Sequence, residues 1–279
     1  MKSRYICPVC SCVLEEHEKS YKCENNHCFD VSAEGYINLA SAKKGNTEIS
    51  GDAADACRAR RRFLEAGHYK PLADKICSYL SQIDASKNSL IVDAGCGEGY
   101  YSRQIKSEYP NFDIYGIDLA KQGIKMAAKY QKSLELKCHY SVAGIFDMPF
   151  ESGSASAVIS VFAPVADKES YRVLRDGGLL IVACPGKNHL FGLKEALYET
   201  PMQNEEKIPD YDGFVLEDTS SVTYPLELEG EDASALFAMT PYFWRSSKDV
   251  REKSADLGKI TTDADFIVKV YRKTQEKSE

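Results

Sequence analysis

The feature that most constrains the fold is a short apolar segment followed by a glycine-rich turn. Residues 90–92 read Leu-Ile-Val, Asp93 follows, and glycines then alternate with other residues at Gly95, Gly97 and Gly99. Glycine is needed where the backbone takes a positive φ angle or comes very close to a ligand. When such a turn joins the first strand to the first helix of an α/β domain, its backbone N–H groups lie beside a bound cofactor. We therefore predict a buried strand, a cofactor-binding turn and a helix, in this order.

The glycine spacing and the acid indicate which cofactor the turn accepts. A dinucleotide-binding turn reads G-x-G-x-x-G, whereas here the third glycine comes one residue earlier. Asp93 directly before the turn would repel a pyrophosphate, but it suits a cationic cofactor with an amino acid group. This combination resembles motif I of the methyltransferases that use S-adenosylmethionine (SAM). The resemblance implies that Asp93 and the loop with Gly95, Gly97 and Gly99 bind SAM; an ordinary glycine turn is the alternative.

A second acid follows the next predicted strand. Residues 113–117 read Asp-Ile-Tyr-Gly-Ile and end at Asp118, 25 residues beyond Asp93. An acid at the end of the second strand of such a sheet is placed to accept hydrogen bonds from two ribose hydroxyls. A carboxylate here also suits the cap of a helix predicted over residues 119–130. The two roles are compatible, and we assign Asp118 to the cofactor site.

The rest of the core continues an alternation of strands and helices, which is typical of a doubly wound sheet. Further strands are predicted over residues 136–142, 157–162 and 178–183. The alternating segment 265–271 fits a final antiparallel strand. Before the core, residues 52–80 have a helical pattern that is interrupted at 67–71.

The N-terminal segment has the spacing of a zinc site. Cys7-x2-Cys10 is followed after twelve residues by Cys23-x3-His27, which gives four ligands in two short knuckles. Four such ligands form a closed tetrahedral site without an open position for activating water, so we interpret the zinc as structural. Cys28 adjoins His27 and is the alternative fourth ligand.

Composition and cysteine distribution set the class and the compartment. The chain has 279 residues, 43% of them hydrophobic and 28% charged, and ten cysteines. Half of the cysteines crowd the first 28 residues, which favours a metal site over a disulfide framework. No apolar run approaches the length of a membrane span, so we expect a cytoplasmic protein. We divide it into residues 1–37 (zinc-binding unit), 38–80 (linker and helices) and 81–279 (core).

The charge is unevenly distributed. The net charge is −7, yet residues 1–70 hold 11 Lys+Arg against 10 Asp+Glu, which leaves 24 against 32, a balance of −8, for the remainder. Arg58, Arg60, Arg61 and Arg62 form a basic run that could contact phosphates. A solvated helix face explains such a run equally well.

A succession of short motifs covers most of the chain. The motifs are Cys-Pro-x-Cys at 7–10, Phe-Asp at 29–30, Glu-Gly-Tyr-x-Asn-Leu at 34–39, Gly-Asp at 51–52, Ala-Arg at 59–60, Phe-Leu at 63–64, Gly-His-Tyr-x-Pro at 67–71, Gly-Glu-Gly-Tyr-Tyr at 97–101, Phe-Ala-Pro at 162–164, Arg-Val-Leu at 172–174, His-Leu at 189–190 and Phe-Ala-Met-Thr-Pro-Tyr at 237–242. This succession resembles the bacterial large-subunit rRNA (guanine-N1) methyltransferases, the RlmA (RrmA) family.

This resemblance implies a fold, a reaction and further site residues. The fold is a Rossmann-like SAM-dependent methyltransferase, with a seven-stranded doubly wound sheet and a small N-terminal zinc-ribbon or knuckle domain. Tyr69 and His189 contact SAM alongside Gly97, Glu98 and Gly99. The partner is a hairpin loop of 23S rRNA, held by the zinc unit and the basic run, and a homodimer is left open. Phe162 and Trp244 offer stacking surface for the target guanine, although core packing explains them equally well.

The loop after the fourth core strand narrows the methyl acceptor. It reads Val161-Phe162-Ala163-Pro164, and so lacks the Asn/Asp-Pro-Pro-aromatic motif of enzymes that methylate exocyclic amines. Cys184 has no pattern that supports a nucleophile for pyrimidine C5 chemistry. Ring nitrogens, oxygens and small molecules remain, and the sequence identifies no general base. The alternatives are a small-molecule methyltransferase with a structural zinc lid and a non-catalytic zinc-ribbon protein.

Overall fold

The N-terminal unit is a small antiparallel sheet. The computed structural model describes residues 2–40, 54–84, 89–206, 209–240 and 258–274. The strands β1 (Lys2–Ile6), β2 (Val13–His17), β3 (Ser20–Lys22) and β4 (Cys28–Asp30) pair in that order. Cys7, Cys10, Cys12 and Cys23 lie in the turns between these strands. The buried side chains of Tyr5, Leu14 and Tyr21 pack in a core that this sheet shares with the second sheet.

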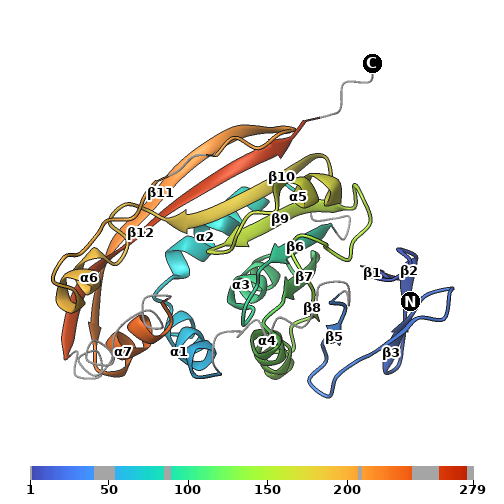
Figure 1. Cartoon of the computed structure of the whole chain (residues 1–279), viewed down its shortest axis with the longest axis horizontal. Coiled ribbons are helices and arrows are strands. Elements are labelled where there is room, and N and C mark those ends of the chain that lie inside the picture. The colour runs from blue at the N-terminus through green and yellow to red at the C-terminus, as the bar shows by residue number, and fades with distance from the viewer. Residues whose placement is uncertain (1, 41–53, 85–88, 207–208, 241–257, 275–279) are drawn as a thin grey trace.

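The second sheet has eight strands and forms the centre of the molecule (Figure 1). Its order is β11-β12-β10-β9-β6-β7-β8-β5. The strands are β5 (Ile37–Asn38), β6 (Leu90–Ala94), β7 (Asp113–Asp118), β8 (Cys138–Val142), β9 (Ala155–Val161), β10 (Leu174–Pro185), β11 (Phe214–Glu229) and β12 (Lys259–Lys273). From β5 to β10 all neighbours are parallel, while β12 runs antiparallel to β10 and β11. The chain moves outward from β6 through β7 and β8 and then returns to β9, so the order reverses beside β6, where α/β sheets bind ligands.

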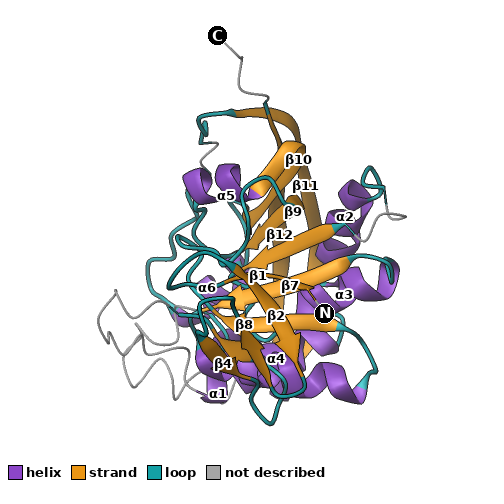
Figure 2. Ribbon diagram, turned by 90° about the vertical axis from the view of Figure 1, so that its right-hand side faces the viewer, coloured by secondary structure: helices purple, strands orange, loops and turns teal. Residues whose placement is uncertain are grey.

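Helices cover both faces of this sheet (Figure 2). The helices are α1 (Ala54–Glu65), α2 (Lys70–Leu80), α3 (Tyr100–Glu108), α4 (Lys121–Ser133), α5 (Asp167–Val173), α6 (Phe191–Leu197) and α7 (Glu231–Ala238). Ile91 of β6 packs in one core with α2, α3 and α4, whereas Val92 packs in the other with α5 and the N-terminal unit. Because both faces are covered, the central strands are apolar throughout rather than alternating. The predicted doubly wound sheet is confirmed, with β5 as an eighth strand.

Two features of the sheet were not apparent in the sequence. β12 is much longer than the predicted strand 265–271, and it pairs along its whole length with β11, for which no strand was predicted. β11 is largely exposed on one face and polar in its first half, so its apolar pattern is weak. Its hydrogen bonds to β12 stabilise it where the side-chain pattern gives little signal.

The N-terminal unit is attached to the core beside the loop that follows β8. β5 pairs with β8, the Ile6 N–H donates to the Pro149 carbonyl oxygen at 2.9 Å, and the Tyr5 ring stacks on Phe150 at 5.6 Å. The segment that ends in the first cysteine ligand is therefore fixed to the edge of the core sheet. In the described part of the chain, no helix has the length and apolarity needed to cross a membrane.

Candidate active site and metal site

The glycine turn joins β6 to α3, and its glycines serve different purposes. All three have positive φ angles: 83° at Gly95, 56° at Gly97 and 79° at Gly99. A Cβ on Gly95 would lie 2.6 Å from Cβ of Ala163, and one on Gly99 would lie 2.6 Å from the Tyr140 hydroxyl, so packing excludes side chains there. A Cβ on Gly97 would meet only the Nη1 atom of Arg60, at 3.9 Å. Gly97 therefore presents its backbone to open space, as a cofactor-binding turn requires.

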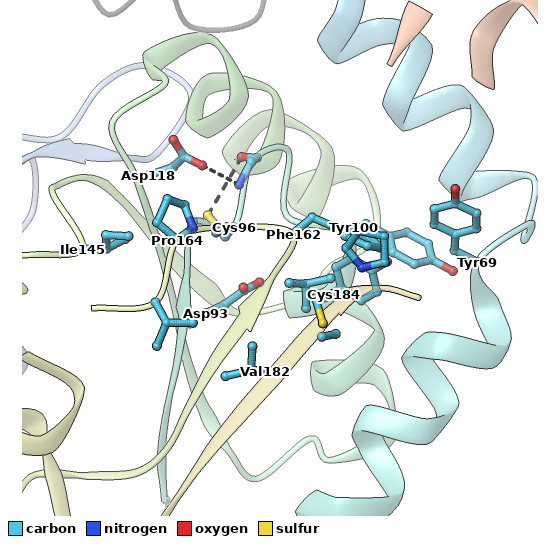
Figure 3. A pocket seen from close by; sticks show the side chains of 18 of the residues that line it. Tyr69, Asp93, Cys96, Tyr100, Asp118, Ile145, Phe162, Pro164, Val182 and Cys184 are labelled. Atoms are coloured by element: carbon cyan, nitrogen blue, oxygen red, sulfur yellow. Dashed lines mark hydrogen bonds between the residues drawn. The ribbon is translucent and has the colours of Figure 1, made fainter. Parts of the chain in front are cut away.

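That open space is a cavity of about 940 Å³ at the carboxyl ends of the central strands (Figure 3). Its volume lies at the upper end of the range for small-molecule sites, about 300–1,000 Å³. The turn and Asp118 line one part, and the ends of β9, β10 and β12 line another. The cavity thus extends from the predicted cofactor site towards the loop that was expected to face the methyl acceptor.

Asp93 is a buried acid in the wall of this cavity. Its side chain accepts a hydrogen bond from the Ser102 hydroxyl at 2.6 Å, and the residue is only 2% exposed. Burial raises the pKa of Asp93 to about 6, with a further contribution from the Asp118 charge, while the Ser102 bond opposes the shift. The carboxylate is predominantly ionised at neutral pH and lies in a low-dielectric environment, where a cation is bound strongly.

Asp118, at the end of β7, is hydrogen-bonded to the turn and to the start of α4. The Gly97 N–H donates to one carboxylate oxygen at 2.9 Å, and the Ala120 N–H donates to the other at 2.7 Å. The carboxylate therefore fixes the glycine turn while it lines the cavity. A carboxylate has about four acceptor positions in all, and ribose hydroxyls are donors that suit such a group.

Glu98 has a different environment from the other predicted cofactor residues. Its carboxylate is buried against Arg103 at 2.9 Å, and Arg103 also donates to Glu65 at 2.6 Å. This network connects the turn with α3 and α1. Glu98 lines the cavity, and its charge is neutralised by Arg103.

Tyr69 and His189 are 120 residues apart in sequence but adjacent in the cavity wall. The Tyr69 hydroxyl lies 3.4 Å from Nε2 of His189. The Asp265 backbone N–H donates to Nδ1 at 3.2 Å, so the proton of a neutral ring is on Nε2. Burial lowers the pKa of His189 to about 4, and the ring is neutral at physiological pH. Residue spacing alone did not indicate either residue, whereas the family motifs did.

Phe162 occupies a strained position at the end of β9. Its φ angle is 54°, unusual for a residue other than glycine, and its side chain is 44% exposed. The ring stacks on His189 with a centroid distance of 5.9 Å and lines the cavity. Phe162 thus offers an open aromatic face, whereas Trp244 lies outside the described residues.

The basic run on α1 does not form a single surface. Arg60 lines the cavity and donates to the Met239 carbonyl oxygen at 3.3 Å. The Arg61 guanidinium lies 3.5 Å above the Tyr130 ring. Arg58 pairs with Asp55, and Arg62 pairs with Glu231 and Asp232. The side chains of Arg58 and Arg62 are more than half exposed, and ion pairs at such positions are weak.

The N-terminal unit gathers the four predicted zinc ligands. The ligand atoms of Cys7, Cys10, Cys23 and His27 all lie within 4.8 Å of one another. Nδ1 of His27 is 3.5 Å from Sγ of Cys7 and 3.4 Å from Sγ of Cys23. Three thiolates and one imidazole fit tetrahedral zinc. Cys28 is exposed and lies outside this cluster.

Comparison with known proteins supports both halves of this arrangement. A family model described as "RlmA, N-terminal" matches residues 5–46, and one described as "Methyltransferase domain" matches residues 91–178. The chain is 28% identical to the 23S rRNA (guanine(748)-N(1))-methyltransferase of Streptomyces fradiae, with 88% of each chain covered. It is 31% identical to Bacillus subtilis (strain 168) YxjB, whose name provisionally gives it a 23S rRNA (guanine-N(1)-)-methyltransferase activity, with 95% of this chain and 96% of the relative covered. Among solved structures, that of a geranyl diphosphate methyltransferase in complex with SAM has a TM-score of 0.49 at 14% identity and covers 86% of this chain and 97% of that one.

Proposed function

The chain belongs to the family of 23S rRNA (guanine-N1)-methyltransferases, and from this premise we propose that it methylates N1 of one guanine in a hairpin loop of 23S rRNA. The similarity to YxjB over 95% of the chain is the observation that carries the proposal. The relative covers the N-terminal unit and the core together, so the likeness is not confined to the generic methyltransferase sheet.

The donor half of the cavity fits SAM. When bound, SAM supplies a methyl group activated by a sulfonium charge. We propose that the Gly97 backbone holds its amino acid group, that Asp93 attracts its positive charge, and that Asp118 accepts its ribose hydroxyls. Arg60, beside Gly97, is placed for the carboxylate of the same group. This is a reassignment of Arg60 from the RNA contacts expected on sequence grounds.

The part of the cavity around Phe162, which we call the acceptor half, suits a flat base that is not in a Watson–Crick pair. N1 of guanine is occupied in a Watson–Crick pair, so the base must be unpaired or extruded before the reaction. We propose that the exposed ring of Phe162 stacks on it. Neutral His189 stacks on the Phe162 ring and the Tyr69 ring lies tilted beside it, so that both fix the orientation of that ring and exclude water. Alignment of donor and acceptor then provides much of the rate acceleration.

We propose that the N-terminal unit (residues 1–37) positions the hairpin, with zinc as its structural centre. Arg58 and Arg62 make exposed ion pairs that RNA phosphates can replace at little cost. The linker and helices (38–80) and the core (81–279) supply the donor site. A homodimer remains a prediction, to be tested by light scattering.

Mapping of the methylated nucleotide tests the proposed function. Protein-free 23S rRNA is incubated with the enzyme and isotopically labelled SAM, digested and analysed by mass spectrometry. We expect one labelled N1-methylguanosine in one hairpin loop, and none with the Asp118→Ala variant. If the protein binds SAM but leaves the rRNA unlabelled, the result contradicts the proposed function and favours a methyltransferase that acts on small molecules.

A further inference from the structure

A buried lysine on β12 lines the cavity and has no role in the site described so far. Lys269 is 2% exposed, between the core residues Val268 and Val270. Burial of an ammonium group in a strand costs free energy, so lysine is seldom buried unless it is paired, and Lys269 does have an interaction partner. An ammonium group carries three N–H donors in all. The Lys269 side chain lies in the cavity wall, on the opposite face of the strand from Val268 and Val270.

The order of the strands places Lys269 on the acceptor side. The cofactor turn and Asp118 follow β6 and β7, whereas the chain continues in the other direction through β9 and β10 to β12. Lys269 is the direct partner of Val182 on β10, and the cavity wall there also includes Cys184 and Tyr271. Lys269 therefore lies at the β10–β12 side of the cavity, away from the glycine turn, on the opposite face of β12 from Phe266, which the Phe162 ring contacts.

The charges of the cavity are asymmetric. Its lining residues include four acids, Asp93, Glu98, Asp118 and Glu205, and the Glu98 carboxylate is paired with Arg103. Arg60 and Lys269 are the two Lys or Arg side chains among its described lining residues, and Arg60 lies beside Gly97. Positive charge from Lys269 reaches the end of β10, since it lowers the pKa of the Cys184 thiol against the larger, opposite effect of burial.

The reaction proposed above needs positive charge on this side. Guanine N1 carries a proton at neutral pH, and once the proton leaves, the negative charge is shared between N1 and O6. We propose that the Lys269 ammonium donates a hydrogen bond to O6 of the target guanine and stabilises this anion, an inference that rests on the proposed function. Lys269 is then a catalytic residue of the acceptor site, which acts as an oxyanion-stabilising group.

The step balances without a further reactant. The N1 proton passes to water, and the N1 electron pair forms the new bond to the methyl carbon. The carbon–sulfur bond of the donor breaks, and its electron pair neutralises the sulfonium. The products are neutral N1-methylguanine, a neutral thioether and one proton released to solvent.

Other titratable groups surround the lysine, and their effects on a pH profile must be distinguished from the effect of Lys269. Cys184, Glu205, Tyr211 and Tyr271 line the same wall, while Glu206 acts on Cys184 and Asp210 acts on Tyr271. Burial raises the pKa of the Cys184 and Tyr211 side chains and that of Tyr271 to about 12. A thiol has a lower ordinary pKa than a phenol, so the contribution of Cys184 is removed in a Cys184→Ser background.

The test compares pH profiles of methylation by variants at Lys269. Wild type, Lys269→Met and Lys269→Gln are assayed on the rRNA hairpin, so that the result does not depend on the folding of one variant. Lys194→Met is the matched control: Lys194 is also buried, but it donates to Met202 and Asn204 and does not line the cavity. SAM affinity is measured for each protein.

We expect kcat of the Lys269 variants to fall about 100-fold at neutral pH, as for loss of one oxyanion-stabilising donor. The rate depends on the fraction of guanine that is deprotonated at N1, so the difference in kcat between wild type and the variants should shrink with increasing pH. The pH profile of the variants should therefore lie about two pH units to the alkaline side of the wild-type profile. SAM affinity should be unchanged, and the shift should persist when Lys269→Met is added to Cys184→Ser. Lys194→Met should keep the wild-type profile.

Parallel profiles of wild type and both Lys269 variants would overturn the inference, and so would a loss explained by weaker SAM binding. Failure of the proposed function has a separate signature, because wild type itself would then form no N1-methylguanosine.

Discussion

At the residue scale, the site depends on side chains whose surroundings set their protonation state or their orientation. Asp93 and Asp118 both lie at the carboxyl ends of strands. The Asp93 carboxylate is fully buried, whereas the Asp118 carboxylate accepts hydrogen bonds from two backbone N–H groups. His189 is held neutral by burial. The two charged acids and the neutral imidazole therefore have distinct functions in one cavity.

The raised pKa of Asp93 predicts a pH dependence of SAM binding. Protonation below about pH 6 removes the charge that attracts the cation, so SAM affinity should fall as the pH drops from 8 to 5. His189 stays neutral over this range and does not contribute. Calorimetric titration checks this, and Asp93→Asn should weaken binding about 10- to 100-fold and abolish the pH dependence. A dependence that survives in Asp93→Asn would contradict the assignment.

The same pKa has a consequence for stability in the absence of SAM. The pKa of Asp93 is raised from 3.8 to about 6 on folding, so the folded state holds a proton that the unfolded chain has released between these pH values. The contribution of Asp93 to the free energy of unfolding therefore falls as the pH rises through this window. SAM binding to the ionised form offsets the loss.

Arg60 gives a second prediction at this scale. Because its guanidinium borders Gly97, Arg60→Met should raise the Kd for SAM about tenfold, the loss of one charge-assisted hydrogen bond. Arg58→Met is the control, since Arg58 lies on the same helix with an exposed side chain, and it should leave the Kd unchanged. Weaker RNA binding by Arg60→Met with unaltered SAM affinity would instead favour the RNA role expected from the basic run.

At the element scale, the zinc knuckles and the core sheet are mechanically connected. The Ile6 backbone, next to Cys7, bonds to Pro149, and the loop before Pro149 carries Ile145 and Phe146 into the cavity wall. The N-terminal sheet thus helps to hold the floor of the cofactor site.

This connection predicts how loss of zinc affects the protein. Cys23→Ala should abolish zinc binding, lower Tm and weaken SAM binding several-fold, because a zinc-dependent unit loses most of its folding energy without the metal. Metal analysis measures the zinc content, and calorimetry measures Tm and SAM affinity. Cys28→Ala should retain the zinc, since Cys28 lies outside the ligand cluster. Loss of zinc from Cys28→Ala would show that Cys28 is the fourth ligand.

At the scale of the whole molecule, the charge opposes the proposed partner. A net charge of −7 repels RNA, so binding must depend on local cations and on shape. Affinity for the hairpin should therefore fall with salt. Removal of Arg58 and Arg62 together should reduce the slope of log K against log salt by about one unit for each phosphate that the protein no longer neutralises. An unchanged slope in a filter-binding series would place the RNA on another surface.

The sequence by itself determined the features that depend on residues close together in the chain. The zinc ligands lie in two pairs only three and four residues apart, and the glycine turn needs a few consecutive residues, so their spacing specifies them. The apolar strands and the break between α1 and α2 at Gly67 were likewise predictable, because backbone conformation and burial depend on local pattern.

Tertiary structure alone decided the composition of the cavity. It brings Tyr69 to His189, turns Arg60 towards the glycine turn, adds β5 to the sheet and places Lys269 in the cavity wall. These residues come from both ends of the chain, and no local pattern encodes their proximity. The order of strands in the sheet determines it, because parallel strands gather the loops at their carboxyl ends wherever these lie in the sequence.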